Sequence, residues 1–92
     1  MKSKKEIQVE VMQILGRIIE DENRLPRGIN DNFGENIDSL EFVMMFVELE
    51  ETYGIQINDE DFEIENASTI NKVSELILKY ILDNKTAEND EV

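Results

Sequence analysis

The sequence predicts an all-α fold, a small four-helix up-down bundle with three main helices, one short helix and a long first loop. Three segments repeat apolar residues at helical spacing, and each begins at a residue that can cap a helix. A chain of 92 residues allows one domain with a small core and leaves little room for a deep catalytic cavity. We expect a domain over residues 1–82 and a flexible tail over 83–92.

The first helix is predicted to begin at Ser3, because Ser3 and Glu6 have the spacing of a capping box. We expect it to fade near residues 21–23. Its predicted inner face consists of Ile7, Val11, Ile14, Leu15 and Ile18. A connection of unusual length follows over residues 25–37, and a loop of this length is more often functional than merely a connection. Three spaced apolar side chains are expected to pin it to the core: Leu25, Ile29 and Phe33.

The central helix carries two agreeing start signals. Asp38 and Glu41 form a second capping-box pattern, and Ile37 and Phe42 stand at the positions of a hydrophobic staple. Ser39 is therefore predicted at the first helical position, near unpaired backbone N–H groups and the positive end of the helix dipole. That environment favours a phosphate group.

The central helix is expected to end at Tyr53, with Gly54 in the C′ position that glycine favours. A short extended link leads to a brief helical turn that begins at Asn58 and continues through residues 59–62. Thr69 is predicted to cap the last helix. The apolar stripe of that helix consists of Ile70, Val73, Leu76, Ile77, Tyr80 and Ile81.

Composition argues against several classes of function. The chain has neither cysteine nor histidine, which removes thiolate chemistry and the commonest general base and metal ligand. No acidic stretch has the ligand spacing of an EF-hand, so we expect no metal site. Acid-base catalysis by paired carboxylates needs a pocket, and the carboxylates here are predicted on a solvated helix face, so we expect no catalysis by the chain itself. No apolar run approaches the ~20 residues needed to span a membrane. We therefore expect a cytoplasmic monomer that does not insert into membranes.

Charge is distributed unevenly along the chain. The net charge is −13, and the interval from Gly28 to Asn71 contains twelve Asp and Glu residues but no Lys or Arg. Such a surface repels nucleic acid and attracts partners with basic patches. Solubility alone is the simpler explanation of an acidic surface. The concentration of acids around Ser39 favours a docking role.

The Asp38-Ser39-Leu40 motif, at the start of an acidic amphipathic helix, resembles the acyl carrier proteins and their relatives, the D-alanyl and peptidyl carrier proteins. The resemblance runs from about Glu6 to Ile81, although many relatives have a glycine shortly before the serine, where this chain has Asn36 and Ile37. It implies that Ser39 carries 4′-phosphopantetheine through a phosphodiester, and that Asp38 helps to hold metal ions while the cofactor is loaded. It also implies a phosphopantetheinyl transferase, an acyl- or aminoacyl-loading ligase and downstream synthases or transferases as partners.

The resemblance leaves the cargo open. A fatty acyl or polyketide chain, as in fatty acid biosynthesis, is the first interpretation, and an amino acid on a D-alanyl or peptidyl carrier is the alternative. A hypothesis from another class is an acidic helical adaptor that is never modified and binds proteins through the central helix.

The central helix has two apolar sides. At about 100° per residue, Phe42, Phe46, Leu49 and Tyr53 cluster on the predicted core side, flanked by Val43 and Met45. Exposed apolar residues ringed by acids are typical of an interface. The predicted partner surface consists of Leu40, Glu41, Met44, Val47, Glu48 and Glu51.

Overall fold

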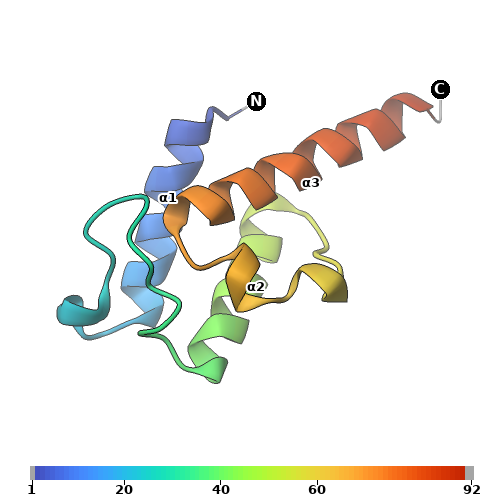
Figure 1. The fold of residues 1–92 in the computed structure, drawn as a ribbon. Helices are drawn as coiled ribbons and strands as arrows, with labels where there is room; N and C mark the ends of the chain where they lie inside the picture. The colour runs from blue at the N-terminus through green and yellow to red at the C-terminus, as the bar shows by residue number, and fades with distance from the viewer. Residues whose placement is uncertain (1, 91–92) are drawn as a thin grey trace.

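The computed structural model describes the backbone of residues 2–90 and the side chains of residues 2–83. Its helices are α1 (Lys4–Ile18), α2 (Ser39–Tyr53) and α3 (Ile70–Asp90). Three short 3-10 turns connect them: η1 (Glu22–Arg24), η2 (Asp59–Asp61) and η3 (Ile64–Asn66). Helices α1 and α2 run in opposite directions and α3 crosses them (Figure 1). The all-α prediction is confirmed, and the predicted short helix is the 3-10 turn η2.

Helix α1 begins where its capping box predicts. The backbone N–H of Glu6 donates to Ser3 Oγ over 3.2 Å, and the N–H of Ser3 donates to Glu6 Oε1 over 3.4 Å. The helix ends at Ile18, before the predicted region of fading. Ile18 is only half-buried, whereas Ile19, just past the helix, is 1% exposed. The other predicted inner-face residues are all buried: Ile7, Val11, Ile14 and Leu15.

Helix α2 packs its core side against α1 and α3, with Phe46 and Leu49 fully buried. Val43 and Met45 are both predicted to flank the core side, and they differ: Met45 is fully buried, whereas the prediction is wrong for Val43, which is 49% exposed. The reason is the position of α1. Glu48 lies one turn beyond Met45 and pairs with Arg17 of α1, so this side of α2 faces α1.

The long first loop is attached to the start of α3 by backbone hydrogen bonds. The N–H of Phe33 donates to the carbonyl of Ser68 over 2.9 Å, and the N–H of Asn71 donates to the carbonyl of Ile29 over 2.8 Å. The Phe33 side chain is buried as predicted. The Ile29 side chain is 43% exposed, so Ile29 contributes through its carbonyl instead. Leu25 packs against the core while half-buried.

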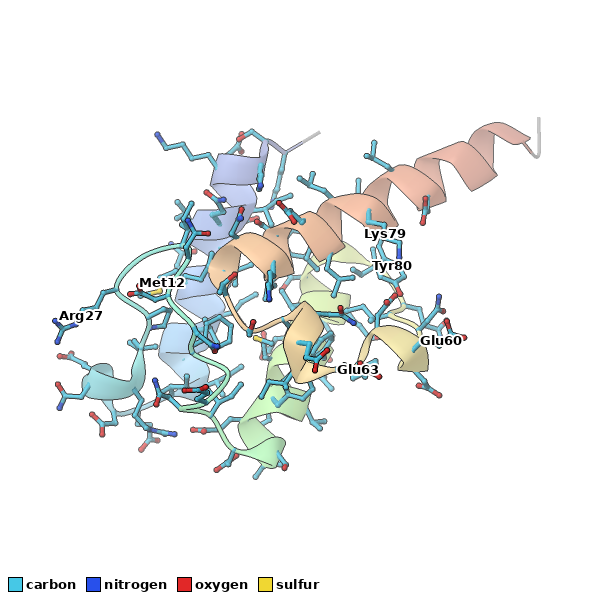
Figure 2. All side chains as sticks on the ribbon, viewed as in Figure 1. Met12, Arg27, Glu60, Glu63, Lys79 and Tyr80 are labelled. Carbon is cyan, nitrogen blue, oxygen red and sulfur yellow. The ribbon has the colours of Figure 1, made fainter. Side chains whose placement is uncertain are left out.

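Helix α3 begins at its predicted cap, since Thr69 Oγ1 accepts from the N–H of Lys72 over 3.0 Å. Tyr80 points from α3 toward η2 (Figure 2), where its hydroxyl accepts from the N–H of Asn58 over 2.9 Å and donates to Asp61 Oδ2. Burial raises the pKa of the Tyr80 hydroxyl. This buried tyrosine thus holds the link between α2 and α3.

The backbone of α3 remains helical to Asp90, beyond residue 82, where the sequence predicts the end of the domain. Its last turns extend away from the rest of the molecule (Figure 1). The predicted flexible tail over 83–92 remains a prediction, and residues 91–92 lie outside the described residues.

Candidate functional site

The start of α2 lies at the end of the first loop, on the edge of the molecule (Figure 1). Its capping box is complete, because the N–H of Glu41 donates to Asp38 Oδ1 over 2.8 Å and the N–H of Asp38 donates to Glu41 Oε1 over 3.0 Å. Ser39 is the first residue of the helix, and its side chain is exposed. The Ser39 hydroxyl therefore lies at the positive end of the helix dipole, in a first turn that the carboxylates of Asp38 and Glu41 cap.

A contact that the sequence did not reveal lies beside Ser39. Arg24, in η1, donates through Nη1 to Glu41 Oε1 over 2.8 Å and through Nη2 to Glu41 Oε2 over 2.7 Å. Nη1 also donates to the carbonyl of Asn36 over 3.0 Å. The Arg24 guanidinium and then the Asp38 N–H hold the pKa of the Glu41 carboxyl below its usual range. The sequence offers one signal for this contact: Arg24 lies shortly before the interval from Gly28 to Asn71 that contains no Lys or Arg.

An apolar groove of about 400 Å³ opens next to Ser39. It is lined by Ile37, Asp38, Ser39, Phe42, Val43, Phe62 and Ile64. The rings of Phe42 and Phe62 flank the buried ring of Phe46, with centroid separations of 4.8 and 4.4 Å. The groove thus has a wall of large apolar side chains from α2, η3 and the link between α2 and α3.

The predicted partner residues separate into two groups. Leu40 is 68% exposed, Met44 43% and Val47 45%, and the unpredicted Val43 adjoins them at 49%. We call Leu40, Val43, Met44 and Val47 the α2 face. The carboxylates lie differently: Glu51 is exposed, Glu48 pairs with Arg17 over 3.4 Å, and the Glu41 side chain is only 13% exposed beside Arg24.

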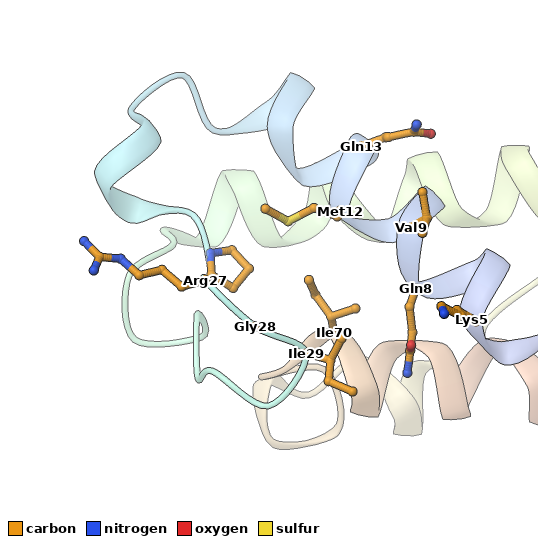
Figure 3. A pocket seen from close by; sticks show the side chains of 10 residues that line it. Lys5, Gln8, Val9, Met12, Gln13, Arg27, Gly28, Ile29 and Ile70 are labelled. Atoms are coloured by element: carbon orange, nitrogen blue, oxygen red, sulfur yellow. The ribbon is translucent and has the colours of Figure 1, made fainter.

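A second groove of about 410 Å³ lies between α1, the first loop and the start of α3 (Figure 3). Its lining is mostly apolar, and Lys5 and Arg27 contribute to it. Val9 and Met12 reach it from α1, and Ile29 reaches it from the loop. None of the residues predicted for a site lines this groove, so it is separate from the start of α2.

Two structural features bear on alternative functions. Among these residues, no group of three or more His, Cys, Asp or Glu side chains is placed to hold a metal ion. None of the helices in the described part of the chain is both long enough and apolar enough to cross a membrane.

Comparison with protein families identifies the domain. Residues 7–77 match the family model described as a phosphopantetheine attachment site, and the match includes all of α2 and its capping box. No curated protein and no solved structure gives a significant match. The match covers most of the chain, so the whole helical domain, including the exposed start of α2, is assigned to this family. The chain belongs to the phosphopantetheine-attachment family, the carriers to which 4′-phosphopantetheine is covalently bound.

Proposed function

We propose that this protein is an acyl carrier protein whose 4′-phosphopantetheine is attached to Ser39. The observation that carries the proposal is the exposure of the four serines in the chain. Ser74 is fully buried, and Ser68 is 7% exposed. Ser3 is exposed but lies outside the family match at residues 7–77. Ser39 alone combines an exposed hydroxyl with a place inside the matched region.

The surroundings of Ser39 suit a phosphodiester. The first turn of α2 provides unpaired backbone N–H groups and the positive end of the dipole. Ser39 Oγ forms a bond to the phosphorus of coenzyme A that bears the pantetheine arm, the pyrophosphate bond breaks, and 3′,5′-ADP leaves. The Ser39 proton is taken up in the active site of the transferase, so no base is needed within the chain. Asp38 uses Oδ1 for the cap, and among the described residues no hydrogen bond engages Oδ2. We assign Oδ2 to the metal ions that accompany loading.

The groove beside Ser39 favours a fatty acyl or polyketide cargo over an amino acid. Its wall of Phe42, Phe62 and Ile64 offers apolar surface to a hydrocarbon chain. The charged group in its lining is the Asp38 carboxylate, which also caps α2 through Oδ1. The acyl group is held as a thioester on the terminal thiol of the arm. Partner enzymes carry out the chemistry, and this protein delivers the intermediate to them.

The α2 face is the proposed docking surface. It joins four exposed apolar residues with the exposed carboxylate of Glu51, in a region of the chain without Lys or Arg. An apolar centre with a charged rim is typical of transient interfaces. The partners are the transferase, an acyl-loading ligase and downstream synthases with complementary basic patches.

Intact-mass spectrometry after incubation with a phosphopantetheinyl transferase and coenzyme A tests the proposal. The wild-type chain should gain the mass of one phosphopantetheine, and Ser39→Ala should gain none. Ser3→Ala is the matched control, because it also removes an exposed hydroxyl near a helix start and should still load. An unmodified wild-type chain would favour the adaptor hypothesis, and a loaded Ser39→Ala chain would refute the assignment of the site.

The cargo is tested with acylated coenzyme A as the donor. Loading the octanoyl arm should raise the melting temperature above that of the unacylated loaded form, because the hydrocarbon chain covers the groove. Loading an alanyl arm should leave the melting temperature near that of the unacylated form. Equal melting temperatures for all three forms would contradict the role given to the groove.

A further inference from the structure

Arg24 connects the 3-10 turn η1 to both sides of Ser39. Its Nη1 binds the Asn36 carbonyl, which precedes the serine, and its two terminal nitrogens bind the Glu41 carboxylate, which follows it. The Glu41 side chain is 13% exposed and the Arg24 side chain 37%. A planar guanidinium matches a carboxylate in this two-point geometry, which a lysine cannot reproduce.

Among the described residues, few other hydrogen bonds join the start of α2 to the preceding loop, and Ile37 and Phe42 add apolar packing against the core. The N–H of Asn36 donates to the carbonyl of Phe33 over 2.9 Å, and the capping box itself is local to residues 38–41. Arg24 is the contact that ties this local unit to η1, whose own cap is Asp21. Without Arg24, we expect the capping box still to form and the direction of the first turn to be held by the packing of Ile37 and Phe42 alone, which restricts it less.

We propose that Arg24 is a positioning residue for phosphopantetheine loading, which it supports by fixing the first turn of α2 in the orientation that the transferase needs. The inference rests on the proposed modification of Ser39. Arg24 acts through Glu41 and Asn36, and the structure shows no contact between Arg24 and the Ser39 hydroxyl. Transfer rates are sensitive to such fixing, because a reacting group displaced by about 1 Å can lose a large part of its rate.

A purely electrostatic role for Arg24 predicts the opposite result. Removing a cation makes the surface around Ser39 more acidic, and a transferase with a basic patch should then associate more quickly. If Arg24 positions the serine, its removal should slow transfer despite the added acidity. The sign of the change therefore separates the two roles.

The experiment measures kcat and KM for loading by a phosphopantetheinyl transferase with coenzyme A, at a temperature well below the melting transition of every variant. Arg24→Met should lower kcat about tenfold with little change in KM, because Ser39 is less well oriented in the complex while the binding of the chain to the transferase is unchanged. Arg24→Lys should recover part of the loss, because one ammonium group cannot bind Asn36 and both oxygens of Glu41 together. Arg27→Met is the matched control: it removes an exposed cation three residues further along the chain, and no ion pair of Arg27 is found among the described residues.

A mutant cycle tests whether Arg24 acts through Glu41. Glutamine keeps the capping-box pattern, so Glu41→Gln removes mainly the charged partner of Arg24. The double variant of Arg24→Met and Glu41→Gln should load no more slowly than the slower single variant. If the double variant lost the product of the two single reductions in loading rate, Arg24 and Glu41 would act independently, and the proposal that Arg24 acts through Glu41 would be contradicted.

The inference and the proposed function fail in different ways. If the wild-type chain loads at Ser39 but Arg24→Met loads at an equal or higher rate, the positioning role is wrong and the carrier function stands. An equal fall in kcat for Arg27→Met would show that the loss does not depend on the contacts of Arg24 with Asn36 and Glu41, and would also overturn the inference. If the wild-type chain does not load, the proposed function itself is wrong.

Discussion

Met44 and Met45 are adjacent in the sequence but lie on different faces of α2: Met45 is fully buried, and Met44 is 43% exposed. Met45 packs in the core on the side that faces α1, whereas Met44 belongs to the α2 face. The pair therefore separates the residues that hold the helix from those available to a partner.

Alanine at these two positions should have very different effects. Met45→Ala should lower the free energy of unfolding by about 2–5 kcal/mol, because it leaves a cavity in a packed core. Met44→Ala should change it by less than about 0.5 kcal/mol, as for an ordinary surface substitution. Urea titrations of both variants measure the difference. A large loss for Met44→Ala would place Met44 in the core.

A charge at Met44 should impair docking without unfolding the chain. Met44→Glu puts a carboxylate in the apolar centre of the α2 face, so transfer of the acyl group to a downstream enzyme should slow while stability stays within about 0.5 kcal/mol of wild type. Gln13→Glu adds the same charge at an exposed position on α1 and serves as the control. Equal transfer rates for both variants would exclude the α2 face as the interface.

The Glu41 carboxylate should make stability depend on acid pH. Its pKa is lowered in the folded protein, first by the hydrogen bonds from Arg24 and then by the one from the Asp38 N–H. Its contribution is fully present above the unfolded-state pKa of about 4.3 and is lost as pH falls through the lower folded-state value. Glu41→Gln should thus be less stable than wild type at pH 7, and the difference should shrink below about pH 4. Urea unfolding of both proteins across this pH range measures the difference in stability. A difference that does not change with pH would show that Arg24 stabilises the fold equally through an amide and through a carboxylate at position 41.

The start of α2 was predictable because its signals are local. A cap, its partner three residues later and a hydrophobic staple all act within one turn, so the sequence pattern of Asp38 and Glu41 appears unchanged in the structure. The Arg24–Glu41 contact spans 17 residues and depends on the path of the loop between them. No local pattern encodes that path.

The contacts of the first loop could also be predicted only in part. Apolar spacing predicted buried side chains for Ile29 and Phe33, and only Phe33 is buried. Ile29 is held through its carbonyl, which accepts from the N–H of Asn71 in the first turn of α3. Any residue has a carbonyl, so such a contact leaves no signature in the sequence.

Loading should slow as salt rises. The α2 face lies in the interval without Lys or Arg, and charges are screened beyond about 10 Å at ~0.1 M ionic strength. The value of kcat/KM for a basic transferase should fall steadily across a salt series. Glu51→Gln removes an exposed carboxylate beside the α2 face and should flatten the dependence. A flat series for the wild-type chain would indicate that the acidity serves solubility alone.

The last five residues should be dispensable for stability. Among the side chains that the structure describes, which end at residue 83, Tyr80 and Ile81 are the last members of the core along α3. Deletion of residues 88–92 should shift the melting temperature by less than about 4 °C, whereas Ile77→Ala, in the buried part of α3, should shift it by more. A large shift on deletion would show that the end of the chain docks on the domain.

The hydroxyl of Tyr80 should hold the link between α2 and α3 in place. It accepts from the N–H of Asn58 over 2.9 Å and donates to Asp61, while its ring is buried in the core. Tyr80→Phe keeps the ring and removes both hydrogen bonds, so it should lower the free energy of unfolding by about 0.5–1.5 kcal/mol. Hydrogen exchange of the Asn58 amide should also become faster, because its acceptor is gone. Tyr53→Phe is the matched control, since the hydroxyl of Tyr53 donates to Glu10 Oε1 over 2.7 Å and no backbone amide donates to it among the described residues. It should leave exchange at Asn58 unchanged, and equal exchange in both variants would show that the Asn58 amide is protected without Tyr80.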